Sequence, residues 1–432
     1  MTAFTRRTAL SVGAALLAAP AISRAQGAQS VRELTFYYPI AVGGPIPRVI
    51  DGYCAAFQQQ TGIKVNPVYA GTYGETLTKA VTAIRGGAGP HFAVLLAAEL
   101  HSLQDLDILA AIEDSDTGSD TAAWMSGFFP AFMANSRAEG KTWSVPFQRS
   151  TEIYYYNKDA YREAGLDPEA PPKTWAEMIT VGQKLTRRGD NARWGMKLAN
   201  DAGNGQWTFG ALTNQVGHKL MNDAGTETYF THPLAIEAAT FWRDMAFTHH
   251  ITPQGQTAWA TLAPDFLAGS AAAIWSTTGN LTNMRTNARF PFGVGGLPGK
   301  ESPHTVVGGG NMYVLKNASA AERAAAMQFA RFVSAPERAA DWCIKTGYLA
   351  TRPEAWETEA LKRYTEEFPA ALVAKNQLPV ATGELSTFEN QRVYKSLNDN
   401  LQAMMGGTKT PQQAMADTQA DAERALRPFR HA

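Results

Sequence analysis

Residues 33–98 read ELTFYYPIAVGGPIPRVIDGYCAAFQQQTGIKVNPVYAGTYGETLTKAVTAIRGGAGPHFAVLLAA, and this stretch decides the fold. Segments rich in β-forming residues alternate with segments whose apolar residues recur at helical spacing. The pattern predicts strands at 33–38, 64–70 and 92–98 and helices at 48–60 and 73–85. Such a β-α-β-α-β order implies a parallel sheet with helices on both faces, where ligands collect at the carboxyl ends of the strands.

The rest of the chain begins a second α/β region and then becomes mostly helical over its last hundred residues. Residues 143–147 suit an extended crossover. Further strands are expected at 153–157, 271–275, 292–297 and 305–315, and further helices at 159–164, 174–188, 233–248, 261–268 and 319–334. No Gly/Ser linker separates the regions, so we expect two lobes that share crossing segments. The expected N-terminal lobe is 26–145 plus about 304–352, and the C-terminal lobe is 146–303 plus about 353–432.

The first 25 residues have the composition of an export signal. A twin arginine at 6–7 precedes an Ala/Leu-rich stretch at 9–22, and Ala25 closes a small-residue cleavage context. Pro20 and Arg24 interrupt the apolar run before the roughly 20 residues that a membrane anchor needs. We therefore expect a Tat-type signal peptide that is cleaved after about Ala25, and a periplasmic protein.

Composition excludes several classes of protein. Lysine and arginine together number 39, and aspartate and glutamate together also number 39. The lysines and arginines do not form runs. Both observations argue against a nucleic-acid partner. A hydrophobic fraction of 45% excludes a disordered chain. The two cysteines, Cys54 and Cys343, could form a disulfide after export, but each lies in an apolar-periodic segment. That setting favours two buried free thiols.

Motifs for catalysis are missing from the sequence. There is no G-x-S-x-G elbow and no H-E-x-x-H pair, and His249-His250 suits a solvated helix end better than a zinc site. The glycines at 43–44 and 308–310 lack the further residues of a Walker or dinucleotide fingerprint. We therefore expect no catalytic residue, no metal and no cofactor.

Several segments suit small-molecule binding instead, although each has an ordinary structural alternative. Tyr73 precedes a predicted helix, and residues 148–151 (Gln-Arg-Ser-Thr) follow the crossover, where the two lobes meet. Arg149 there would either form a surface ion pair or bind an anion through its five donors. Candidate stacking faces and polar main-chain sites are Trp207, Trp259, Trp275, residues 277–280 and the glycines at 308–310.

Taken together, these segments resemble the extracytoplasmic solute-binding proteins of ABC importers (family 1). The resemblance covers nearly all of the chain after the signal, and it is closest to the glycerol-3-phosphate-binding branch and similar to maltose-binding protein. Its most specific pieces are YYYNKD at 154–159, AGLDP at 164–168, PPKTW at 171–175, KTGYL at 345–349, KTPQQA at 409–414, AGTY at 70–73 and GG at 308–309.

The resemblance implies an α/β fold of two parallel-sheet lobes, joined by a hinge, with the ligand in the cleft between them. Carried over by position, the pocket would contain Arg392, and Arg392 and Arg149 would be the natural partners of an anionic group. The sequence differs from the glycerol-3-phosphate-binding branch at two places. Residues 37–44 lack the aromatic-His-Ser segment of that branch. Ala98 occupies the position where a glutamate is expected, and Glu99 is the next residue in the chain. The candidate ligand-binding residues are Tyr73, Glu99, Arg149, Ser150, Trp207, Thr277, Thr278, Gly309, Tyr348 and Arg392.

The expected function is that of a periplasmic substrate-binding protein of an ABC importer. Its partners would be a small solute, namely a glycerol phosphate, a glycerophosphodiester or a sugar, and the membrane subunits of a permease. We expect a monomer that binds no nucleic acid. The alternative is a secreted hydrolase or lyase that acts on carbohydrate or phosphodiester, whose signature would be a pair of suitably spaced acids.

Overall fold

The computed structural model describes residues 31–201, 203–300 and 302–430. The expected signal peptide at 1–25 lies outside the described residues, so its Tat character and its cleavage site stay predictions. Within the described residues, no helix combines the length and the apolar character needed to cross a membrane.

The N-terminal strands and helices form as the alternating pattern predicts. Strands β1 (Glu33–Tyr38), β2 (Lys64–Tyr69) and β3 (Phe92–Leu96) are parallel, with β1 in the middle, and α1 (Ile46–Thr61) and α2 (Tyr73–Arg85) connect them. The third strand is shorter than predicted because Ala97–Glu99 turn into a short 3₁₀ helix. The carboxyl ends of these strands therefore point toward the start of α2, as a ligand site requires.

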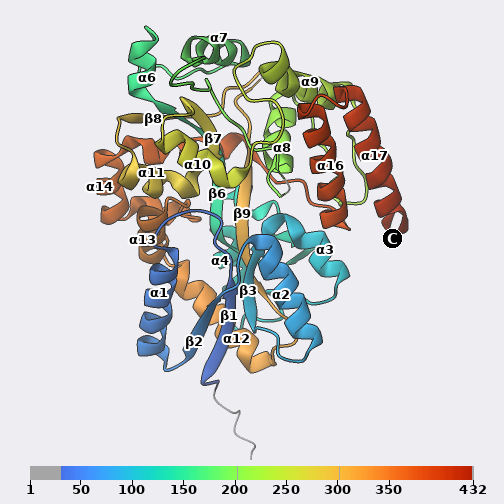
Figure 1. Cartoon of the computed structure of the whole chain (residues 1–432). Coiled ribbons are helices and arrows are strands. Elements are labelled where there is room, and N and C mark those ends of the chain that lie inside the picture. The colour runs from blue at the N-terminus through green and yellow to red at the C-terminus, as the bar shows by residue number, and fades with distance from the viewer. Residues whose placement is uncertain (1–30, 202, 301, 431–432) are drawn as a thin grey trace, which may run out of the picture. The chain divides into compact units, whose positions relative to one another are not determined.

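Two long strands link this part of the sheet to the second α/β region (Figure 1). Strand β6 (Val145–Asn157) is buried at every residue, and its first half pairs antiparallel with β9 (Thr305–Val314). Its second half pairs antiparallel with β7 (Ala273–Thr277) and β8 (Phe292–Gly295). Because β9 also pairs with β3, the order across the sheet is β2-β1-β3-β9-β6-β7. The expected crossover at 143–147 is thus the start of a strand that runs on through the predicted strand at 153–157.

The second region differs from the sequence-based expectation in the direction of its strands. All three ladder partners of β6 run antiparallel to it, whereas parallel pairing appears at isolated bridges such as Trp194–Ala271 and Lys197–Ile274. Strand direction depends on which distant segments pair, and hydrophobic periodicity does not carry that information.

The remaining elements are mostly helices. Those of the first 150 residues are α3 (Leu100–Asp105), α4 (Thr121–Ser126), α5 (Pro130–Met133) and the hairpin β4 (Arg137–Ala138) and β5 (Lys141–Thr142). The middle of the chain contains α6 (Lys158–Glu163), α7 (Trp175–Leu185), α8 (Gly205–Gln215), α9 (Pro233–Phe247), α10 (Trp259–Leu267) and α11 (Leu281–Asn287). The C-terminal part contains α12 (Ala320–Val333), α13 (Pro336–Thr346), α14 (Glu359–Glu367), α15 (Leu372–Gln377), β10 (Ala381–Thr382), α16 (Asn390–Met405) and α17 (Pro411–Leu426).

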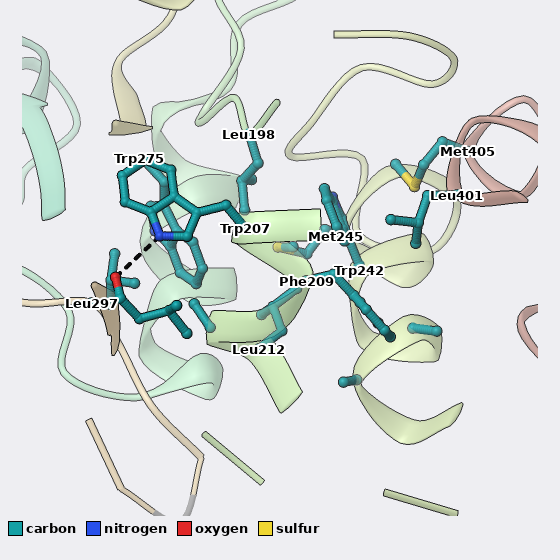
Figure 2. Packing of buried hydrophobic residues seen from close by; sticks show 14 of the residues in the cluster. Leu198, Trp207, Phe209, Leu212, Trp242, Met245, Trp275, Leu297, Leu401 and Met405 are labelled. Carbon is teal, nitrogen blue, oxygen red and sulfur yellow. Dashed lines mark hydrogen bonds between the residues drawn. The ribbon is translucent and has the colours of Figure 1, made fainter. Parts of the chain in front are cut away.

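Two hydrophobic clusters correspond to the two regions. The first packs β1–β3 against α1 and α12 and includes the stacked rings of Phe36 and Phe92. The largest packs α7, α8, α9, α16 and α17 together, and Figure 2 shows part of it, with Trp242 and Met245 beside Phe209. Ser319 and Glu322 form the expected capping box at the start of α12.

The two cysteines are buried free thiols, as the sequence favoured. Cys54 and Cys343 are each 4% exposed, and they do not form a disulfide. Burial raises the pKa of both thiols to about 12, so neither is a thiolate at neutral pH.

Candidate functional site

A cavity of about 630 Å³ opens where the carboxyl ends of β1, β3 and β7 approach the start of α2 and one face of α16. Both α/β regions contribute to its wall. Seven candidate residues from the sequence line it, namely Tyr73, Ser150, Trp207, Thr277, Gly309, Tyr348 and Arg392. These residues lie up to 319 positions apart in the chain, Tyr73 to Arg392, so the fold alone brings them together.

The N-terminal wall is positioned by the start of α2. Thr72 caps this helix through a reciprocal capping box with Glu75, which fixes the backbone of Tyr73 at the first helical position. The Tyr73 hydroxyl is buried and has no hydrogen-bond partner among the described residues. Burial, with Tyr348 nearby, holds the pKa of this hydroxyl well above its usual value, so it is a neutral donor and acceptor.

The crossing strands form the floor, where Ser150 and Gly309 line the cavity. Gly309 has a φ of +92°, and a Cβ atom at this position would overlap the carbonyl oxygen of Gln148 on the paired strand β6. Glycine therefore allows β9 to lie against β6 while its main chain faces the cavity. The contact between the crossing strands is the ordinary structural role of the glycine run, and its close approach to a ligand stays a prediction.

Two tryptophans form an apolar part of the cavity wall. The rings of Trp207 and Trp259 lie 5.7 Å apart between centroids, at 48° to one another. Their indole N–H groups donate to the carbonyl oxygens of Val306 (3.1 Å) and Ala41 (3.3 Å). Since both polar atoms are already bonded, the two side chains present only their ring surfaces to a ligand. Trp275, the third candidate face, is instead fully buried in the core.

The C-terminal part contributes polar groups from two segments. Gly347, with a left-handed φ of 88°, ends α13 and directs Tyr348 into the cavity, where its ring stacks on Trp342 at 5.8 Å. Arg392 lies on α16, and its side chain remains 66% exposed, with a long 3.6 Å ion pair to Glu389. Its guanidinium is therefore accessible to an anionic group.

Three candidates lie outside this cavity wall. Glu99 is buried and accepts hydrogen bonds from Asn390 Nδ2 at 3.3 Å and from Gln391 Nε2, which ties the end of β3 to the start of α16. Burial raises the pKa of Glu99 to about 7. Thr278 is buried in the 3₁₀ turn after β7, and Arg149 is fully buried beneath the floor.

Arg149 has an unusual environment for a guanidinium. Its Nη1 donates to Gly309 O at 3.1 Å, while Nε and Nη2 have no partner within the described part of the chain. Burial lowers its pKa to about 10, an effect that the negative charge of Glu384 partly offsets. Arg149 therefore remains charged at neutral pH and acts on the cavity from behind its wall.

The residue that sequence reasoning missed is Glu384, which lines the cavity while only 3% exposed. It follows β10 in a stretch with neither helical nor strand periodicity, so the sequence offered no signal for it. Apart from Arg392, the polar face of α16 was also missed, although Gln391, Lys395 and Asn398 follow helical spacing from the start of that helix.

A second, larger cavity of about 950 Å³ lies between α5, α8 and residues 375–386. None of the candidate residues lines it, and its walls include Phe129, Leu220 and Leu378. The smaller cavity is the better candidate site, because convergent polar groups and unpaired buried hydroxyl and carboxyl groups meet there.

Two α/β lobes that share crossing strands and enclose a cavity with convergent polar groups define the class of periplasmic binding proteins. The family model described as bacterial extracellular solute-binding protein matches residues 52–370, and the chain belongs to this family. Because this family and the relatives below are binding proteins that act outside the cytoplasm, binding is favoured over the hydrolase or lyase alternative.

Relatives of known name agree with this assignment. The chain is 29% identical to the sn-glycerol-3-phosphate-binding periplasmic protein UgpB of Pectobacterium atrosepticum, over 93% of both chains. It is similar to the solved structure of UgpB from Mycobacterium tuberculosis in complex with glycerophosphocholine, at a TM-score of 0.81 and 22% identity, covering 92% of this chain and 98% of that one. A maltose/maltodextrin-binding domain from Bdellovibrio bacteriovorus bound to maltotriose matches at a TM-score of 0.77 and 20% identity, over 91% and 100% of the chains.

Proposed function

We propose that the protein is the periplasmic substrate-binding component of an ABC importer, which captures a glycerol-phosphate-type or carbohydrate solute and releases it unchanged. The observation that carries the proposal is the 630 Å³ cavity, because both lobes supply its polar lining, with Tyr73 from one lobe and Thr277 from the other. A ligand that contacts both lobes stabilises the closed arrangement. The permease then recognises that arrangement.

The chemistry of the cavity supports a solute with one anionic end and one polar, hydroxylated end. Arg392 offers an accessible guanidinium for a phosphate. Arg149 is enclosed beneath the floor and acts on the ligand through its charge alone. The ring surfaces of Trp207 and Trp259 suit the apolar face of a sugar or a glycerol chain.

Closure would occur about the crossing strands. We place the N-terminal lobe at 26–145 plus about 304–352 and the C-terminal lobe at 146–303 plus about 353–432. With these bounds β9 belongs to the N-terminal lobe and β6, except Val145, to the C-terminal lobe, so the ladder between the two strands lies at the boundary. The twin arginine at 6–7 supports export by a Tat-type signal that is cleaved after about Ala25.

The test is a titration of the exported protein with sn-glycerol-3-phosphate, glycerophosphocholine and maltotriose. A ligand at about 100 times its Kd should stabilise the protein against unfolding by about 2.7 kcal/mol, which calorimetry and thermal shift both detect. Mass spectrometry of the recovered solute should show an unchanged molecule. Failure of all three solutes to bind, or recovery of a modified solute, would refute the proposal.

A further inference from the structure

Glu384 lies in the cavity wall. Hydrogen bonds hold its backbone in place, whereas its carboxyl group has almost no hydrogen-bond partner. Asn135, from the turn after α5, donates from Nδ2 to Glu384 O at 3.1 Å and accepts from Glu384 N at 2.9 Å through Oδ1. Both peptide groups of Glu384 are therefore bonded to one side chain 249 residues away. This arrangement holds the backbone of Glu384 in place without using either oxygen of its carboxyl group.

The carboxyl oxygens lack donors. Oε2 has no hydrogen-bond partner in the described chain, and Oε1 is reached only by the Tyr394 hydroxyl, at 3.4 Å. The same hydroxyl lies much closer to Leu385 O, and a single proton cannot serve both acceptors. Since a buried acceptor without a donor is costly, a ligand that supplies donors here gains binding energy.

The charges around Glu384 select the kind of donor. Burial raises the pKa of Glu384 to about 8, and the buried guanidinium of Arg149 offsets only part of this effect. Glu384 therefore keeps its proton at neutral pH and does not require a second cation. The hydroxyl of Tyr73, also without a partner among the described groups, lines the same cavity. Neutral hydroxyl groups can donate to the unpartnered oxygen of Glu384 in either protonation state and exchange a hydrogen bond with Tyr73, whereas an anionic group supplies no donor.

We propose that Glu384 is the solute-selecting residue of this cavity, which accepts hydrogen bonds from the adjacent hydroxyl groups of a glycerol or sugar moiety. This inference rests on the proposed function and names the part of the solute that Glu384 recognises. The phosphate of a glycerol phosphate would then lie toward Arg392, away from the carboxylate. Both a glycerol phosphate and a sugar carry adjacent hydroxyl groups that can donate to Glu384. The test below distinguishes these two kinds of solute.

The test is isothermal titration of the exported, full mature protein. The probes are sn-glycerol-3-phosphate, glycerophosphocholine and maltotriose, together with n-propyl phosphate, which keeps the phosphate and the three-carbon chain but has no hydroxyl group. At about pH 9, where Glu384 is ionised because its pKa is about 8, we expect Glu384→Gln to weaken binding of the hydroxylated probe by about 10- to 100-fold, the range of one or two lost charge-assisted hydrogen bonds. Binding of n-propyl phosphate should be weak in the parent protein and insensitive to the change.

Glu152→Gln is the matched control. Glu152 is also a buried carboxyl group with one unpartnered oxygen, but it lies on β6 outside the cavity wall and accepts from Thr208 at 2.7 Å. We expect the Glu152→Gln protein to bind each probe with an affinity within about twofold of that of the parent protein. Glu384→Asp keeps the carboxyl group but shortens the side chain by one methylene group. We expect its loss of affinity to be smaller than that of Glu384→Gln and larger than that of the control. Circular dichroism and thermal unfolding without solute establish that each variant is folded.

The outcomes separate the two proposals. If a hydroxylated probe binds the parent protein and either folded Glu384 variant keeps full affinity, the role of Glu384 is wrong while the proposed function stands. If Glu384→Gln does not fold, Glu384→Asp provides the test. Full affinity of the Glu384→Asp protein for the hydroxylated probe would likewise show that the proposed role of Glu384 is wrong. If no probe binds the parent protein, the proposed function fails, and this inference fails with it. A loss of affinity for sn-glycerol-3-phosphate in the Glu384 variants would identify glycerol hydroxyl groups as the donors. A loss of affinity for maltotriose would identify sugar hydroxyl groups instead.

Discussion

Replacing Gly309 by alanine tests whether the close contact of the crossing strands holds the cavity floor in place. A residue with a Cβ atom pays about 1–2 kcal/mol for left-handed backbone, and the φ of Gly309 is +92°. The new methyl group would also overlap Gln148 O, so β9 must move away from β6. Each buried main-chain hydrogen bond that is broken costs about 1–3 kcal/mol. We therefore expect a loss of about 3–5 kcal/mol in the free energy of unfolding.

Urea unfolding monitored by circular dichroism measures this loss. Gly210→Ala is the control, because it adds the same methyl group near the same strand. Gly210 lies within α8, and its Cβ would meet the Val306 side chain at 3.6 Å, an ordinary contact. In a helix this exchange should stabilise the protein by about 0.5–1 kcal/mol. Equal stabilities of Gly309→Ala and the parent protein would show that the strands do not need glycine here.

Three further predictions concern a helix cap, an anion contact and a buried acid. Thr72→Ala removes the capping box of α2 and should cost about 1 kcal/mol in urea unfolding; an unchanged midpoint would contradict the cap. Arg392→Ala should weaken binding of sn-glycerol-3-phosphate by about 10- to 100-fold in calorimetry and leave maltotriose within about twofold, whereas equal losses would argue against a phosphate contact. Burial raises the pKa of Glu152 to about 8, so the folded state keeps a proton that the unfolded state releases, and stability falls as pH rises from about 4.5 to 8. Glu152→Gln removes this contribution and should be more stable than the parent protein at pH 8 by a few kcal/mol but similar at pH 4.5; parallel stability curves across this range would refute the assignment.

Local pattern predicted much of the fold. The strands at 33–38 and 64–70 and helix α2 match the structure to within one residue, because alternation and helical spacing are properties of a short segment. Helix α8 was missed. It is buried on nearly every side, so it has no polar face to reveal its period. The antiparallel pairing of β6 depends on segments more than a hundred residues away, which no local pattern contains.

The site was predicted less completely than the fold, and for a physical reason. Seven candidates line the cavity, since glycine runs and helix starts are visible in the sequence. Burial is not visible there, so Arg149 looked like an exposed anion contact but lies beneath the floor. Glu384 was not predicted because its position depends on Asn135, 249 residues earlier in the chain.

The central claim is that a solute held between the two lobes draws them together, and a distance measurement across the cavity tests it directly. Spin labels at Thr78→Cys on α2 and Gln412→Cys on α17 report on opposite lobes, and both positions are exposed. The native thiols of Cys54 and Cys343 are buried and should not compete for the label. Pulsed electron resonance should show a shorter mean distance and a narrower distribution when the binding solute, among sn-glycerol-3-phosphate, glycerophosphocholine and maltotriose, is saturating. Identical distributions with and without that solute would contradict capture by closure.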